Sequence, residues 1–120
     1  MDLNEITYRI NGSIFEVNQV LGSGFLEKVY ENAMMIELKE RGLRAERQMP
    51  IKIAYKGHEV GDYFADIVVE GKIVLELKAV SSLEKIHEAQ LLNYLKATGF
   101  KIGLLVYFAY PKAEIKRFIL

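Results

Sequence analysis

The sequence of 120 residues predicts an α/β protein with its elements in the order α-α-β-β-β-α-β. Three observations lead to this prediction. Apolar residues recur at helical spacing near the start of the chain. Runs rich in Val, Ile and Leu occupy its middle, as in strands that are buried on both faces. Glycine-containing turns separate the segments, so the borders between elements can be placed.

Two helices are predicted over residues 2–21 and 25–41. The first carries an apolar stripe at helical spacing, formed by Leu3, Ile6, Ile10, Ile14, Val17 and Leu21. The segment Gly22-Ser23-Gly24 interrupts this periodicity. Gly42 closes the second helix, because glycine readily adopts the left-handed conformation in which helices end.

Residues 44–55 and 58–69 predict two strands that are joined by a turn at Lys56-Gly57. An irregularity is expected near Gly61, because glycine inside a strand often marks a bulge. The two strands should therefore form a hairpin with one break in its regular pairing.

A third strand is predicted over residues 73–80, after a turn at Glu70-Gly71. Ser81 or Ser82 can cap the helix that follows over residues 83–98. Acidic residues in the first turns of this helix suit the positive end of its dipole.

The C-terminal part predicts one more buried strand. Gly99 ends the third helix, and residues 101–108 form an apolar run of strand length. Pro111 then begins a short tail, which forms either a helical turn or a final edge strand.

Composition places the chain among soluble globular proteins, as a single domain over residues 1–120. It is 51% apolar and 27% charged, which is ordinary for that class. The absence of cysteine excludes disulfides and thiolate metal sites. Neither a signal peptide nor an apolar run of about 20 residues is present, so no membrane association and a cytoplasmic location are expected.

The charge balance gives no overall basic footprint for nucleic acid, since 16 basic residues face 16 acidic ones. Two local groups of basic residues remain as candidates for such a patch. They are Arg41, Arg44 and Arg47, and Lys112, Lys116 and Arg117. The simpler interpretation of both groups is solvated surface.

Three charged residues interrupt the two central strands, namely Asp66, Glu76 and Lys78. Burying an unpaired charge costs several kcal/mol, so these groups need each other, a metal ion or water in a cleft. Alternation along the third strand sends Glu76 and Lys78 to one face, together with Val74. It sends Ile73, Leu75 and Leu77 to the opposite face.

The turn between these strands decides whether Asp66 can meet Glu76. The two residues are symmetric about Gly71, so they oppose each other only if the loop has an odd number of residues. A three-residue loop with a left-handed glycine meets this condition. A two-residue loop would pair Asp66 with Leu75 and send Glu76 to the other face, unless a bulge intervened.

An Asp followed by a turn and by Glu-x-Lys on an apolar strand resembles the metal site of the PD-(D/E)xK nuclease superfamily. Gly24 to Tyr30 fit the Gly-x-x-Glu-x-x-Tyr signature of its GxxExxY family. Gln90 to Tyr94 match the Gln-x-x-x-Tyr helix motif of its exonuclease-like branch. The resemblance implies a mixed sheet and a restriction-endonuclease-like αβββαβ core, here with an extra N-terminal helix.

By this resemblance, the protein is a nuclease that hydrolyses phosphodiester bonds of DNA, with RNA as the second choice, using Mg²⁺ or Mn²⁺. Asp66 and Glu76 would hold the ion together with the backbone carbonyl of Leu77, and Glu27 would be an additional ligand, directly or through water. Lys78 would orient the attacking water and stabilise negative charge. Target choice would come from a homodimer or a partner protein.

Three further residues would support this centre by the same resemblance. Tyr30 would support Glu27, one turn away on the second helix, and Gln90 and Tyr94 would orient Lys78 or contact the phosphate backbone. The plain alternatives are a surface carboxylate at position 27 with a half-buried core tyrosine at position 30 and, on the third helix, a buried polar pair satisfied by nearby backbone.

The sequence departs from the family pattern at two positions, and two other interpretations stay open. Asn18 stands where the family often has histidine, so any acid–base role of that histidine is in doubt here. Ala65 replaces the proline of the superfamily name, a loosely kept position. The alternatives are a non-catalytic nucleic-acid-binding or assembly module, and an interaction protein in which the three charges form a structural ion pair.

Overall fold

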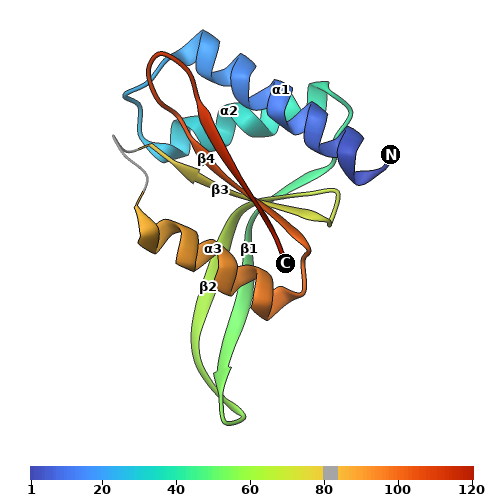
Figure 1. Cartoon of the computed structure of the whole chain (residues 1–120), viewed down its shortest axis with the longest axis vertical. Coiled ribbons are helices and arrows are strands. Elements are labelled where there is room, and N and C mark those ends of the chain that lie inside the picture. The colour runs from blue at the N-terminus through green and yellow to red at the C-terminus, as the bar shows by residue number, and fades with distance from the viewer. Residues whose placement is uncertain (80–83) are drawn as a thin grey trace.

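The computed structural model describes residues 1–79 and 84–120. Its elements follow the predicted order, and the C-terminal tail forms an additional strand (Figure 1). The helices and strands are α1 (Leu3–Leu21), α2 (Glu27–Glu40), β1 (Ala45–Tyr55), β2 (His58–Val69), β3 (Ile73–Lys78), α3 (Lys85–Thr98), β4 (Ile102–Tyr107) and β5 (Glu114–Ile119). The predicted caps Ser81 and Ser82 lie outside the described residues.

The five strands form one mixed sheet in the order β1-β2-β3-β4-β5. The strands β3 and β4 run parallel, because α3 carries the chain back across the sheet between them. The other neighbouring pairs are antiparallel. This arrangement confirms the predicted fold class and makes the tail an edge strand.

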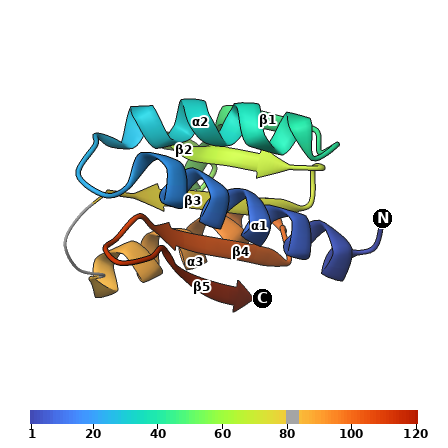
Figure 2. The same ribbon diagram turned by 90° about the horizontal axis from the view of Figure 1, so that it is seen from above.

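The sheet separates two apolar cores. Helices α1 and α2 lie side by side on one face, and α3 covers the other (Figures 1 and 2). As the alternation along β3 predicts, Ile73, Leu75 and Leu77 pack under α1 and α2, whereas Val74 packs under α3. Among the described helices, none is both long and apolar enough to cross a membrane.

The hairpin of β1 and β2 extends past α3 as a two-stranded arm (Figure 1). Its far end, from Lys52 to Asp62, is exposed on both strands. The pairing shifts by one residue where Ile53 faces Gly61 and Ala54 faces Glu59. The predicted irregularity near Gly61 is therefore confirmed.

A glycine sets the height of α3 above the sheet. Gly103 of β4 faces α3, and a Cβ atom placed on it would lie 2.8 Å from Leu91 Cδ1. Leu91 is fully buried, so it has no free space into which to move. The missing side chain at position 103 thus allows α3 to pack closely against the strand beside β3.

We expect Gly103→Val to lower the free energy of unfolding by about 2 kcal/mol, because a valine there overpacks the core against Leu91. Chemical denaturation measures the change. Gly61→Ala is the matched control, since Gly61 is exposed and its Cβ would meet nothing within 4 Å. Equal stability of Gly103→Val and the wild type would contradict this account of the close packing.

Candidate active site

The loop between β2 and β3 has the length that brings two acidic residues together. Val69 pairs with Ile73, so residues 70–72 form a three-residue loop. Glu70 and Gly71 both adopt left-handed conformations, with φ of 54° and 61°. The register continues through Ile67 and Leu75, which places Asp66 opposite Glu76. The condition that the metal-site hypothesis sets on this hairpin is therefore met.

Asp66 lies where the regular pairing of β2 with β3 ends. Beyond Ile67 and Leu75 no further backbone pair forms between the two strands. Instead, Oδ2 of Asp66 accepts a hydrogen bond of 2.7 Å from the backbone N–H of Leu77. The carboxylate therefore fills the gap that opens between the diverging strands and lies beside the backbone of β3. Burial raises the pKa of Asp66, although the hydrogen bond from Leu77 opposes the shift.

Glu76 is a buried acid, and one of its two carboxyl oxygens has no hydrogen-bond partner in the part of the chain that the structure describes. Its exposed fraction is 7%. Its Oε1 atom is buried and accepts no hydrogen bond from the described residues. Burial, and secondly the negative charge of Asp66, raise the pKa of Glu76 to about 8. The fold thus holds together two carboxyl groups that repel each other when both are ionised.

Lys78 is half-buried on the same strand, and its positive charge lowers the pKa of both carboxyl groups. It forms no ion pair with any acidic side chain in the described part of the chain. The hypothesis of a structural ion pair requires such a contact. Its absence leaves the lysine amine available for other chemistry.

Helix α2 contributes Glu27 and Tyr30. Glu27 is exposed in the first turn of α2, and its charge raises the pKa of both Asp66 and Glu76, so it lies near the two carboxyl groups. Tyr30 is fully buried, and its ring stacks on Phe108 with centroids 4.1 Å apart. Its hydroxyl donates a 2.6 Å hydrogen bond to the carbonyl of Gly22. Tyr30 thereby anchors the turn that leads into Glu27.

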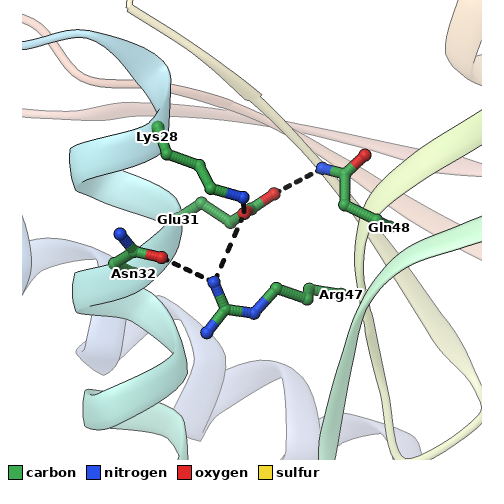
Figure 3. A network of polar contacts seen from close by, with 5 residues as sticks. All are labelled: Lys28, Glu31, Asn32, Arg47 and Gln48. Atoms are coloured by element: carbon green, nitrogen blue, oxygen red, sulfur yellow. Dashed lines mark hydrogen bonds and ion pairs between the residues drawn. The ribbon is translucent and has the colours of Figure 1, made fainter.

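Sequence reasoning missed Glu31, a buried carboxylate one turn after Glu27 (Figure 3). Its Oε2 atom lies 2.7 Å from Nζ of Lys28 and 3.7 Å from Nη1 of Arg47, and Nε2 of Gln48 donates a hydrogen bond to its Oε1. Burial alone would raise the pKa of Glu31, but these contacts outweigh it and lower the pKa. Glu31 is therefore a charged anchor between α2 and β1.

This anchor reaches the site through Gln48. The register places Gln48 opposite Asp66, between the pairs Arg47–Ile67 and Met49–Ala65. Gln48 has a φ of 53°, a left-handed conformation that non-glycine residues rarely adopt inside a strand. The spacing of Glu27 and Glu31 on one helix face could have suggested the second acid. The conformation of Gln48 leaves no signal in the sequence.

Helix α3 brings Tyr94 to the site. Tyr94 is almost fully buried, and its ring centroid lies 5.9 Å from that of Tyr63 on β2. Burial and the charge of Glu76 raise the pKa of both tyrosines, to about 12 for Tyr63, so both lie near that carboxylate. Gln90 is half-buried one turn before Tyr94 and makes no side-chain hydrogen bond to Lys78.

Asp66 and Glu76 fit a hard divalent cation by their chemistry. Both offer carboxylate oxygens, one of which is buried without a partner, and a cation would relieve their mutual repulsion. Within residues 1–79 and 84–120, however, no three His, Asp or Glu side chains are arranged to hold a metal ion. The remaining ligands would have to be main-chain oxygens, water or a reoriented Glu27.

Three of the six residues in the two basic groups of the sequence are paired with acidic side chains. Arg41 pairs with Glu37, Arg47 with Glu31, and Lys116 with Glu88. These contacts support the simpler interpretation of charged surface. The aromatic residues that end β4 are core, since Tyr107 and Phe108 are buried.

Folding stability should fall as the pH rises through the neutral range. Because the pKa of Glu76 is raised in the folded protein, the folded state binds more protons than the unfolded state between pH 4.5 and about 8. The loss is on the order of 5 kcal/mol at most, at roughly 1.4 kcal/mol per pKa unit. Denaturation of metal-free protein at several pH values measures it.

Glu76→Gln should flatten this pH dependence and stabilise the metal-free protein above pH 8, since the amide does not ionise. Glu46→Gln, at an exposed position of β1, is the matched control and should leave the slope unchanged. An identical slope in wild type and Glu76→Gln would contradict the raised pKa.

Two solved structures resemble this chain. The crystal structure of SSO0001 is similar, with a TM-score of 0.63 and 22% sequence identity over 77% of this chain and 48% of that one. This chain thus spans about half the length of that protein. An alkaline exonuclease from Laribacter hongkongensis, LHK-Exo, matches 97% of this chain and 68% of its own, with a TM-score of 0.49 and 13% identity. No curated protein sequence is significantly similar.

The family model described as PD-(D/E)XK nuclease superfamily matches residues 4–118, nearly the whole chain. Together with the likeness to SSO0001, the element order confirms the predicted restriction-endonuclease-like core with an extra N-terminal helix. The chain therefore belongs to the PD-(D/E)XK nuclease superfamily.

Proposed function

We propose that this protein is a metal-dependent nuclease that hydrolyses phosphodiester bonds of DNA, with RNA as the second choice. The observation that carries the proposal is the opposition of the half-buried Asp66 and the buried Glu76, of which Glu76 has an oxygen without a partner among the described residues. Apolar packing alone would not retain such a pair, because it destabilises the fold unless a cation binds. Membership in the superfamily supports the same conclusion.

Within the superfamily, we assign the chain to the GxxExxY group. The assignment rests on Gly24, Glu27 and Tyr30, which keep the spacing of that signature. The buried position of Tyr30 explains why this spacing matters, since its hydroxyl holds the glycine turn from which α2 and Glu27 begin. Residues 1–120 would act as a single nuclease domain.

The proposed metal ion is Mg²⁺, with Mn²⁺ as a substitute, because the available donors are oxygen atoms. Asp66 and Glu76 would hold it together with the backbone carbonyl of Leu77, and Glu27 would complete the set directly or through water. When bound, the ion supplies a more acidic water and neutralises charge on the phosphate.

Lys78 is the proposed catalytic residue outside the metal ligands. Within the described residues, no acidic side chain forms an ion pair with Lys78. Its amine would therefore hold the attacking water and stabilise the negative charge that develops on the phosphate. Tyr30 would position Glu27, and Gln90 and Tyr94 would contact the nucleic acid beside β3. The neutral charge leaves target choice to a homodimer or a partner protein.

A second candidate function is a nucleic-acid-binding or assembly module without catalysis. The observation in its favour is that the described residues contain no preformed group of three metal-ligating side chains. In this case Asp66 and Glu76 would be a remnant of the site. Metal-dependent cleavage separates the two functions.

We expect cleavage of mixed DNA and RNA substrates in Mg²⁺ or Mn²⁺, and a loss of about 100-fold or more in both Glu76→Gln and Lys78→Ala. Lys72→Ala is the matched control, because Lys72 is exposed in the loop at the opposite end of β3. Circular dichroism establishes that each variant is folded.

Equal cleavage by wild type and both variants would identify a contaminating enzyme and contradict the proposed centre. Nucleic-acid binding without cleavage in either metal would favour the non-catalytic module. Activity lost in Glu76→Gln but retained in Lys78→Ala would keep the metal site and remove the role of the lysine.

A further inference from the structure

A groove of about 440 Å³ lies between the β1–β2 arm and α3. We call it the arm–helix groove, and its lining includes Ile53, Tyr63, Gln90, Asn93, Tyr94 and Lys96. Its volume falls in the range of sites that take small organic groups. Apolar surface forms most of the lining, and the polar contributions come mainly from α3.

The arm–helix groove adjoins the strand that carries Glu76. Tyr94, which lines it, packs in one apolar cluster with Val74 and Leu105. Val74 precedes Glu76 on the same face of β3, and Leu105 is the direct neighbour of Glu76 on β4. A chain whose phosphate lies at Asp66 and Glu76 could therefore place an adjoining group in this groove.

The lining matches the chemistry of a nucleobase, which has a flat face and a polar edge. The half-exposed ring of Tyr63 leans at 42° to the ring of Tyr94 and offers an aromatic surface. Gln90 and Asn93 lie three residues apart on α3, and their amides both donate and accept hydrogen bonds, as base edges require. Lys96 follows three residues later, with an ammonium suited to a phosphate.

A paired base cannot enter such a groove, because its faces are stacked and its edge is occupied inside the duplex. An unpaired base can stack on an aromatic side chain, which contributes about 1–3 kcal/mol per base. The groove therefore distinguishes single-stranded from double-stranded nucleic acid more directly than the charge of the surface does.

We infer that the arm–helix groove binds an unpaired nucleobase of a single-stranded nucleic acid next to the scissile phosphate, with Tyr63 as the stacking platform and Asn93 as an edge contact. The inference rests on the proposed function and extends it to the substrate class. In this inference the β1–β2 arm takes part in binding, because β2 carries Tyr63 where the arm leaves the sheet.

The test measures binding of a fluorescein-labelled mixed-sequence single strand, and of the same strand in a blunt duplex, by fluorescence anisotropy in metal-free buffer. The wild type should bind the single strand at least about tenfold more tightly than the duplex. Tyr63→Leu should weaken single-strand binding by about tenfold or more, and Tyr63→Phe, which keeps the ring, should bind like the wild type. Asn93→Ala should cause a smaller loss.

Tyr55→Leu is the matched control, because Tyr55 is 61% exposed at the far end of the same arm and lies outside the groove. It should bind like the wild type. Thermal denaturation checks that Tyr63→Leu is folded, and Tyr63→Phe supplies an independent comparison if it is not, since equal loss in Tyr63→Phe would contradict ring stacking.

The groove and the proposed catalysis can fail separately. Single-strand binding that depends on Tyr63, without cleavage in Mg²⁺ or Mn²⁺, would support the groove and contradict the nuclease. Equal binding of single strand and duplex, or unchanged binding by Tyr63→Leu, would overturn the groove even if the wild type cleaves DNA. Binding of neither substrate would also overturn it.

Discussion

The repulsion between Asp66 and Glu76 is the interaction on which the rest of the site depends. The three-residue loop at 70–72 fixes the register that opposes the two residues, and burial of Glu76 keeps water from screening its charge. Such a pair opposes folding, since one carboxyl group keeps its proton to about pH 8. A protein retains two repelling carboxyl groups most readily where a bound cation offsets their repulsion. The apolar cores on the two faces of the sheet supply the stability that the repulsion removes.

The surrounding elements hold the two acids from three directions. Tyr30 fixes the start of α2 and so the place of Glu27, and Glu31 ties the same helix to β1 through Arg47 and Gln48. From the opposite face, Gly103 lets α3 approach the sheet, which brings Tyr94 toward Glu76. Each contact by itself contributes little to the stability of the fold. Together they place charged groups from α2, β2 and β3 around the end of one strand. The arm then extends this centre outward along α3.

The sequence predicted those features that local rules control. Alternation along β3 correctly placed Leu77 and Glu76 on opposite faces of the sheet. The symmetric positions of Asp66 and Glu76 about Gly71 correctly predicted that the site requires a loop with an odd number of residues, and the loop has three. Features that depend on tertiary packing escaped prediction. In the sequence, Glu31 cannot be told from an acidic residue on an exposed helix surface, because its burial depends on packing against β1. The left-handed conformation of Gln48 could not be predicted either, because such conformations are expected mainly at glycine. Tyr63 became part of the site only because the crossover of α3 places Tyr94 beside it.

Proton release on metal binding tests the central claim most directly. Mn²⁺ is titrated into the full chain by calorimetry in buffers of different ionisation enthalpy, at pH 7 and again at pH 9. Because the raised pKa keeps Glu76 largely protonated at pH 7, binding of one ion should release about one proton there and almost none at pH 9. Binding without proton release at pH 7, or no binding at either pH, would contradict the account of Asp66 and Glu76 as two acidic groups that need a bound cation to balance their charge.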